Sequence, residues 1–252
     1  MIRAVAESTA GPLSIGADIG RAEPWHRSAS GNDLRAAVLG ANDGLVSNFC
    51  LVTGIAGANA QTHAILLTGL AGLIAGACSM ALGEWLSVTN ARELATTQIA
   101  REREELEQTP EAERKELALI FQAKGLSKEE AQKVAETLMR DQRTALETLT
   151  REELGIDPAE LGGNPWRAAV TSFALFAAGA MVPVLPFGVA RAHSPLLLCV
   201  LMSATALAAI GVATSLFNGR SARYSALRQV GVGCAAALAT YGTGLLMGVT
   251  IS

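Results

Sequence analysis

Two carboxylates stand inside segments that are otherwise apolar. Asp43 lies in the run Gly40-Ala-Asn-Asp-Gly44, and Glu84 ends the run Ser79-Met-Ala-Leu-Gly-Glu84. Neither apolar segment contains a Lys or Arg that could pair with its carboxylate. A charged side chain at membrane depth is costly and usually faces an ion pathway or the interior of a helix bundle. A bound cation or a proton is therefore the expected partner of Asp43 and Glu84.

A thioether accompanies the second carboxylate, because Met80 precedes Glu84 by one helical turn and shares its face. A soft sulfur beside hard oxygens suits Fe²⁺ or Mn²⁺ better than Na⁺ or Mg²⁺. Three alternatives stay open. Asn-Asp-Gly can form a turn near the membrane surface, Glu84 can already lie at the interface, and Met80 can simply fill space.

Glutamates recur at helical spacing in the middle of the chain. The candidate metal ligands are Glu102, Glu105, Glu113, Glu116 and Glu153. The first two and the next two are each three residues apart, and the Thr109-Pro110 break between the pairs would fold them toward each other. Clustered carboxylates supply the oxygen ligands that divalent cations prefer. The alternative is a solvated acidic face on a surface helix.

The composition indicates a membrane protein around these residues. The 252 residues are 50% hydrophobic and only 17% charged, whereas soluble domains carry about a quarter charged residues. Of the 23 acidic residues, 17 lie between Ala91 and Pro165. Five segments are long enough to span a bilayer, which needs about 20 residues. They run from about Ala36 to Gly57, Ala64 to Val88, Ala168 to Ala190, Leu196 to Phe217, and Gln229 to Ile251.

The predicted fold is an all-α membrane protein with five transmembrane helices and a cytoplasmic three-helix metal-binding insert between spans two and three. Its parts are a cytoplasmic tail (1–33), spans one and two (34–90), the acidic insert (91–165) and spans three to five (166–252). Lys and Arg concentrate beside the tail, the insert and the last connection, which places these on the cytoplasmic side and the C-terminus outside.

Within the insert, Glu93 to Glu107 is expected to continue the second span in charged form. A second helix follows Thr109-Pro110, and a Ser127-x-x-Glu130 capping box opens a third, from Lys128 to about Leu154. These amphipathic helices are expected to pack on one another and on a second copy of the chain. Glycines four apart in the spans, such as Gly72 and Gly76, favour tight helix packing over a substrate lining.

Several classes of function are excluded by missing residues. A net charge of −3 gives no basic surface for nucleic acid. Only three histidines occur and none follows a Glu-x-x-His pattern, so a di-iron oxidase is not expected. The chain has no P-loop and no G-x-S-x-G motif, and its four cysteines form no metal or disulfide pattern. We expect neither an enzyme nor a bound cofactor.

In several segments the chain resembles the vacuolar iron transporter family, including its bacterial and nodulin-like members. The resemblance is carried by the run from Leu34 to Asn48, by Gly54-Ile-Ala-Gly-Ala58, by Ser79 to Glu84, and by Arg151-Glu-Glu-Leu-Gly155. It covers roughly residue 30 to the end. It implies a homodimer that moves Fe²⁺ or Mn²⁺ out of the cytoplasm in exchange for protons.

Residue by residue, Asp43 and Met80 match the family's membrane-pathway aspartate and methionine, and the five insert glutamates match its cytoplasmic metal ligands. Two departures stand out. Gly72 occupies the place of a pathway glutamate in some members, and Leu149 and Thr150 replace methionines of the cytoplasmic site. We therefore hypothesise that Glu84 replaces the missing carboxylate. The leading interpretation is a metal exporter, and the alternative is a membrane-anchored metal sensor or scaffold without transport.

Overall fold

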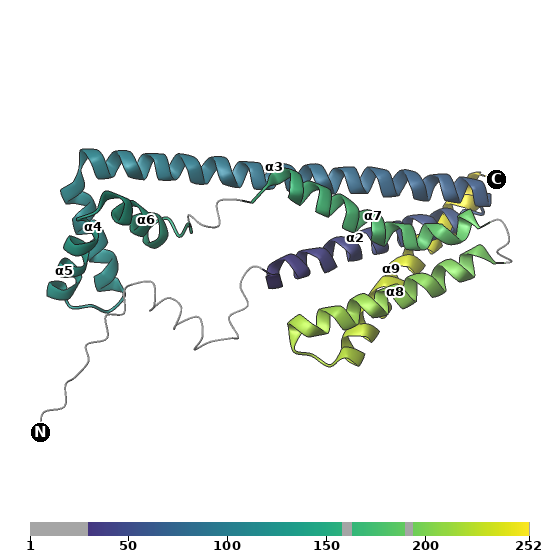
Figure 1. Cartoon of the computed structure of the whole chain (residues 1–252). Coiled ribbons are helices and arrows are strands. Elements are labelled where there is room, and N and C mark those ends of the chain that lie inside the picture. Colours follow the sequence, from purple (N-terminus) through teal and green to yellow (C-terminus); the bar gives the residue numbers. More distant parts are fainter. Residues whose placement is uncertain (1–29, 158–162, 190–193, 252) are drawn as a thin grey trace, which may run out of the picture.

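The computed structural model describes residues 30–157, 163–189 and 194–251, and within these ranges it contains helices, turns and loops but no strand (Figure 1). The helices are α2 (Ser30–Gly57), α3 (Thr62–Gln108), α4 (Pro110–Ala123), α5 (Lys128–Leu138), α6 (Gln142–Glu152), α7 (Pro165–Gly188), α8 (Pro195–Asn218) and α9 (Ala222–Ile251). Most of the predicted tail, residues 1–33, lies outside the described residues.

Five helices, α2, α3, α7, α8 and α9, are long and apolar enough to cross a membrane. They coincide with the five segments predicted from the sequence. The last one begins at Ala222 rather than Gln229, so its first turns carry Arg223 and Arg228. Prolines commonly break or kink a helix, yet α7 runs through both Pro183 and Pro186 to Gly188. Helix α7 is apolar on nearly all sides, and both prolines are buried.

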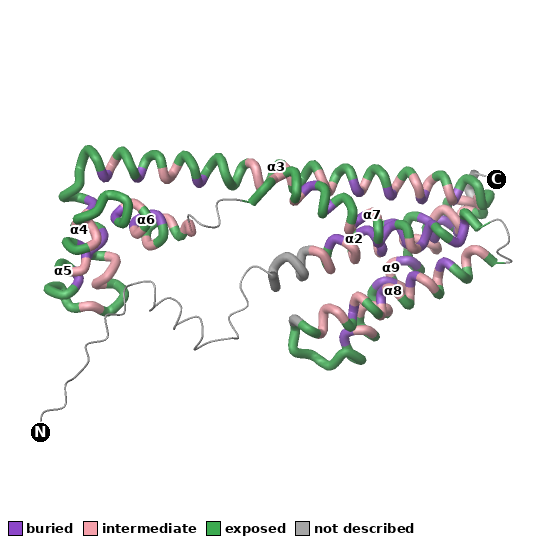
Figure 2. Tube along the Cα trace, in the orientation of Figure 1, coloured by how far each residue is buried: buried purple, intermediate pink, exposed green. Residues whose placement is uncertain are grey.

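Helix α2 lies at the centre of the membrane part and contacts α3, α7, α8 and α9. The close approach of α2 to α7 depends on glycines, which have no side chain. A Cβ on Gly44 would collide with the backbone of Phe176, and a Cβ on Gly179 would collide with the backbone of Ala41. Figure 2 shows the buried residues concentrated along α2 and the facing sides of its neighbours. Close backbone contact of this kind holds helices together in lipid.

Helix α3 joins the membrane part to the insert without a break. Its 47 residues extend about 70 Å at 1.5 Å per residue. The stretch from Thr62 to Glu84 rises about 33 Å, close to the ~30 Å hydrocarbon thickness of a bilayer. The rest carries the charged sequence predicted to continue the second span, and ends at Gln108. The same rigid helix therefore places the insert beyond one end of the spans (Figure 1).

The insert differs from the prediction in one respect. The expected helix from Lys128 to about Leu154 is two helices, because α5 ends at Leu138 and Asp141 caps a new helix. The Asp141 carboxylate accepts a hydrogen bond from the Thr144 backbone N–H at 2.9 Å, which stabilises the new N-terminus. The insert thus comprises the end of α3 and three further helices. The break lets α6 turn back onto α3, with which it is in contact.

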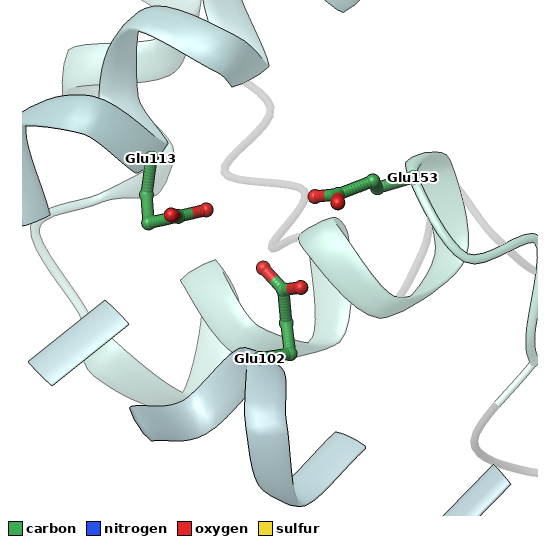
Figure 3. A group of neighbouring side chains, drawn as sticks. All are labelled: Glu102, Glu113 and Glu153. Carbon is green, nitrogen blue, oxygen red and sulfur yellow. The ribbon is translucent and has the colours of Figure 1, made fainter. Parts of the chain in front are cut away.

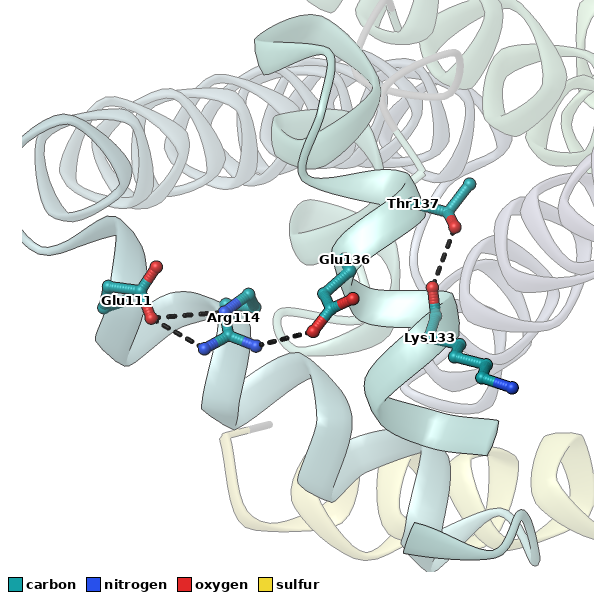
Figure 4. A network of polar contacts seen from close by, with 5 residues as sticks. All are labelled: Glu111, Arg114, Lys133, Glu136 and Thr137. Atoms are coloured by element: carbon teal, nitrogen blue, oxygen red, sulfur yellow. Dashed lines mark hydrogen bonds and ion pairs between the residues drawn. The ribbon is translucent and has the colours of Figure 1, made fainter. Parts of the chain in front are cut away.

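A small apolar core and polar contacts at the surface hold the insert together. The buried core consists of Leu106, Leu117, Ala118, Ala135, Ala145 and Leu149. On the surface, Arg114 of α4 binds Glu111 at 2.7 Å and Glu136 of α5 at 3.3 Å (Figure 4). Exposed ion pairs contribute at most about 1 kcal/mol each. The core therefore fixes the arrangement, and Arg114 adds orientation between α4 and α5.

Candidate metal sites

Three glutamates of the insert point toward one another from three different elements (Figure 3). Glu102 lies on α3, Glu113 on α4, and Glu153 caps the C-terminal end of α6. One carboxylate oxygen from each lies within 4.8 Å of the other two. Oxygens this close, on separate elements, form a pocket of a size that a divalent cation fills.

The core beneath this cluster explains the convergence. Each glutamate stands four residues from a buried leucine on its own helix, and these leucines are Leu106, Leu117 and Leu149. Residues four apart share a helix face, so packing the three leucines together brings the three glutamates together one turn away. The turn at Thr109-Pro110, where the Thr109 N–H donates to the Glu105 carbonyl at 2.7 Å, changes the direction of the chain between α3 and α4 (Figure 1).

Burial gives the cluster unusual electrostatics. The Glu102 side chain is 2% exposed, and its Oε1 has no hydrogen-bond partner among the described residues. Burial, followed by the charges of Glu153, Glu113 and Glu105, raises the pKa of Glu102 to about 7. Burial is also the main cause that raises the pKa of Glu113 and of Glu153. A divalent cation would neutralise this concentrated negative charge and satisfy the open oxygen.

The other two predicted ligands lie at the rim of the cluster. Glu105 pairs with Arg101 at 2.9 Å, and Glu116 is exposed. Both add to the negative charge that raises the pKa of Glu113 and Glu153. Leu149 and Thr150, which replace methionines of the family's site, are buried, and Leu149 belongs to the apolar core. The cluster therefore offers only oxygen atoms as metal ligands, which favours hard cations.

A second candidate site lies between the membrane helices. A cavity of about 350 Å³ is partly enclosed, and its lining residues are Asp43, Ser47, Asn48 and Leu51 of α2, Gly72, Gly76, Ser79 and Met80 of α3, and Phe176 of α7. Asp43 and Met80, 37 positions apart in the sequence, thus share one cavity. Asn-Asp-Gly forms no turn here, because Asp43 lies within the continuous helix α2. The turn interpretation of Asp43 is wrong.

Glycines create this cavity and the close packing around it. Gly72, Gly76 and Met80 lie at four-residue intervals along one face of α3. A Cβ on Gly76 would collide with the Phe176 ring, and a Cβ on Gly72 would collide with Leu51. The two glycines therefore serve both of the roles that the sequence left open, helix packing and cavity lining.

Glu84 is not brought into this cavity. Its side chain is exposed and does not line the space beside Met80. Glu84 also stands about 6 Å further along the helix axis than Met80. The neighbouring Trp85 lies 5.8 Å from Trp166 between ring centroids, and tryptophans gather at membrane interfaces. This placement favours the alternative that Glu84 stands at the membrane surface.

Asn48 is a buried polar residue that the search for charged groups missed. It is 2% exposed and lines the cavity of Asp43 and Met80. Its amide nitrogen donates to the carbonyl oxygens of Gly69 at 3.1 Å and Ala180 at 2.8 Å. The sequence signal was available, since Asn48 is an uncharged but strongly polar side chain within an apolar span.

Comparisons with known proteins agree with this architecture. The chain is 31% identical to a vacuolar iron transporter of Centaurea cyanus over 221 residues, which cover 86% of this chain and 89% of the relative. It is 31% identical to vacuolar iron transporter 2 of Oryza sativa subsp. japonica, covering 84% and 87% of the two chains.

A vacuolar iron transporter of Acanthamoeba castellanii is 40% identical over 162 residues, which cover 64% of this chain and 58% of that longer protein. The sequence model of the VIT family matches residues 34–245. Together with the five apolar helices, these likenesses make the chain an integral membrane protein. The matched region contains both candidate sites, and the chain belongs to the VIT family.

Proposed function

We propose that this protein exports Fe²⁺, Mn²⁺ or both from the cytoplasm in exchange for protons. The observation that carries the proposal is the cavity between α2 and α3, two of the candidate spans, which one carboxylate, Asp43, and one thioether, Met80, both line. An intramembrane carboxylate without a basic partner is a typical feature of ion and proton pathways. The names of the relatives, vacuolar iron transporters, support a metal as the cargo.

The two sites would act in sequence. The insert cluster of Glu102, Glu113 and Glu153 would collect the cation near the cytoplasmic entrance. The cation would then pass to Asp43 and Met80, where sulfur favours transition metals over Mg²⁺. After the metal leaves on the far side, a proton would take its place on the Asp43 carboxylate. This exchange makes the protein a secondary-active transporter and requires no catalytic residues.

The proposal includes an orientation and an assembly. The insert and the N-terminus lie in the cytoplasm and the C-terminus outside, because arginines gather on the insert's side of the spans. The protein acts as a homodimer. In a single chain Asp43 is exposed and its cavity is only partly enclosed, and a second copy against α2 and α3 would close it.

The experiment is uptake of each metal into sealed vesicles that contain the purified protein, with and without a pH gradient. Uptake of Fe²⁺ or Mn²⁺ that is accelerated when the receiving side is acidic supports the proposal. Metal binding by the protein without any uptake would instead support a membrane-anchored sensor. A sensor needs the insert glutamates but not Asp43 or its cavity, so the cavity favours transport.

A further inference from the structure

The orientation of the Asn48 side chain is fixed by two neighbouring helices. Its amide nitrogen donates to Gly69 of α3 at 3.1 Å and to Ala180 of α7 at 2.8 Å, and both acceptors are backbone carbonyls. A carbonyl accepts hydrogen bonds only, so the nitrogen must face these two groups. The side-chain oxygen, Oδ1, consequently faces away from them, and the side chain contributes to the cavity lining.

This oxygen has no partner. Asn48 Oδ1 is buried and makes no hydrogen bond within the part of the chain that the structure describes. A buried acceptor left without a partner destabilises the folded state, and such groups in native proteins call for an explanation. The residues that line the same cavity include Asp43 and Met80. A cation held there would supply the missing partner.

Gly72 lies directly beside this oxygen and has no side chain to cover it. A Cβ at position 72 would come within 2.8 Å of Asn48 Oδ1 and would collide with the end of the Leu51 side chain. Any larger residue at position 72 would therefore press against the oxygen. Gly72 stands where some members of the family resembled have a pathway glutamate. The same glycine leaves the Asn48 oxygen uncovered by any side chain of α3.

We propose that Asn48 Oδ1 is a ligand of the transported divalent cation, together with the Asp43 carboxylate and the Met80 thioether. This inference rests on the proposed function and names a further ligand of its membrane site. The set contains two oxygens and one sulfur, with a single negative charge. Because the amide is already held by Gly69 and Ala180, its oxygen needs no ordering when the cation binds, which favours affinity.

The test measures Mn²⁺ binding to the full-length protein in detergent by the loss of the free-ion electron paramagnetic resonance signal. Substituting Glu102→Gln, Glu113→Gln and Glu153→Gln together disables the insert cluster, and leaves the membrane site to be titrated alone. Two further substitutions are made in this background. Asn48→Leu removes the oxygen, and Gly72→Ala keeps the oxygen but places a Cβ within 2.8 Å of it. Gly83→Ala is the matched control, because a Cβ there meets nothing within 4 Å.

We expect Asn48→Leu and Gly72→Ala each to raise the Kd for Mn²⁺ about tenfold or more. Substituting a residue that merely hydrogen-bonds to a metal ligand already lowers metal affinity by about this much. Gly83→Ala should leave it unchanged. If Gly72→Ala binds Mn²⁺ as tightly as Gly83→Ala, Asn48 is not a ligand, although the membrane site and the proposed function stand. If the background protein binds no Mn²⁺ at all, the membrane site itself is refuted. Should Asn48→Leu fail to fold, Gly72→Ala decides the question.

Discussion

Replacing Glu102 by glutamine should make the metal-free insert more stable at pH 8. The Glu102 carboxyl has a folded-state pKa of about 7, compared with 4.5 ordinarily, mainly because the side chain is buried. The folded state therefore keeps a proton that the unfolded state releases. The stabilisation that comes from this proton is complete below pH 4.5 and is lost as the pH rises through 7. At pH 8 the wild-type insert must hold a buried charge that Glu102→Gln lacks.

The size of the effect follows from the separation of the two pKa values. The two pKa values differ by about 2.5 units. Each unit corresponds to about 1.4 kcal/mol, which sets an upper limit of about 3.5 kcal/mol. Water reaches the cluster from the side of the exposed Glu153 and screens part of this charge. We therefore expect Glu102→Gln to stabilise the metal-free insert by about 1–2 kcal/mol at pH 8, with little difference near pH 4.5.

The assay is hydrogen exchange of the amides in α4 and α6, with protection corrected for the intrinsic exchange rate at each pH. Glu104→Gln is the matched control, because Glu104 is exposed on the same helix and accepts a hydrogen bond from Gln108. Adding Mn²⁺ at pH 8 should protect the wild type and the control but not Glu102→Gln. If metal-free Glu102→Gln is protected at pH 8 no better than the metal-free wild type, the claim that the buried Glu102 charge destabilises the insert is refuted.

Three further outcomes follow from the structure. Glu84→Gln should keep normal, pH-dependent vesicle uptake, because Glu84 does not line the cavity; loss of pH dependence would restore its hypothesised role. Gly44→Ala should destabilise the membrane part by about 1–3 kcal/mol through overpacking against Phe176; a detergent melting temperature equal to that of Gly83→Ala would contradict this. Leu149→Ala should cost the insert about 2–5 kcal/mol and weaken Mn²⁺ binding there, as measured by hydrogen exchange and metal titration.

Length and hydropathy were sufficient to predict the spans. A bilayer imposes about 20 apolar residues on any helix that crosses it, so all five appear as continuous apolar segments. Caps inside the insert were harder to predict. Leu138 marks the end of one helix and Asp141 the start of the next, but Leu138 and Leu146 also fit a single continuous helical pattern.

The residues of the two sites could be predicted from the sequence, but which of them lie together in the structure could not. Spacing placed Glu102 with Glu105 on one helix face, yet the cluster takes only Glu102 of the two, because Glu105 pairs with Arg101. Spacing also placed Met80 beside Glu84, whereas the cavity joins Met80 to Asp43 of another helix. Which helices meet depends on close backbone contacts such as that at Gly44, and a single sequence does not specify these partners.

The most direct test of the proposed exchange records Mn²⁺ entry and proton release together in vesicles that contain the protein, for the wild type and for Asp43→Asn. Glu104→Gln serves as the control for removal of a carboxylate outside both sites. The proposal predicts that wild type and control move Mn²⁺ with a simultaneous opposite flow of protons, and that Asp43→Asn loses both. Undiminished coupled transport by Asp43→Asn would contradict the pathway through this cavity.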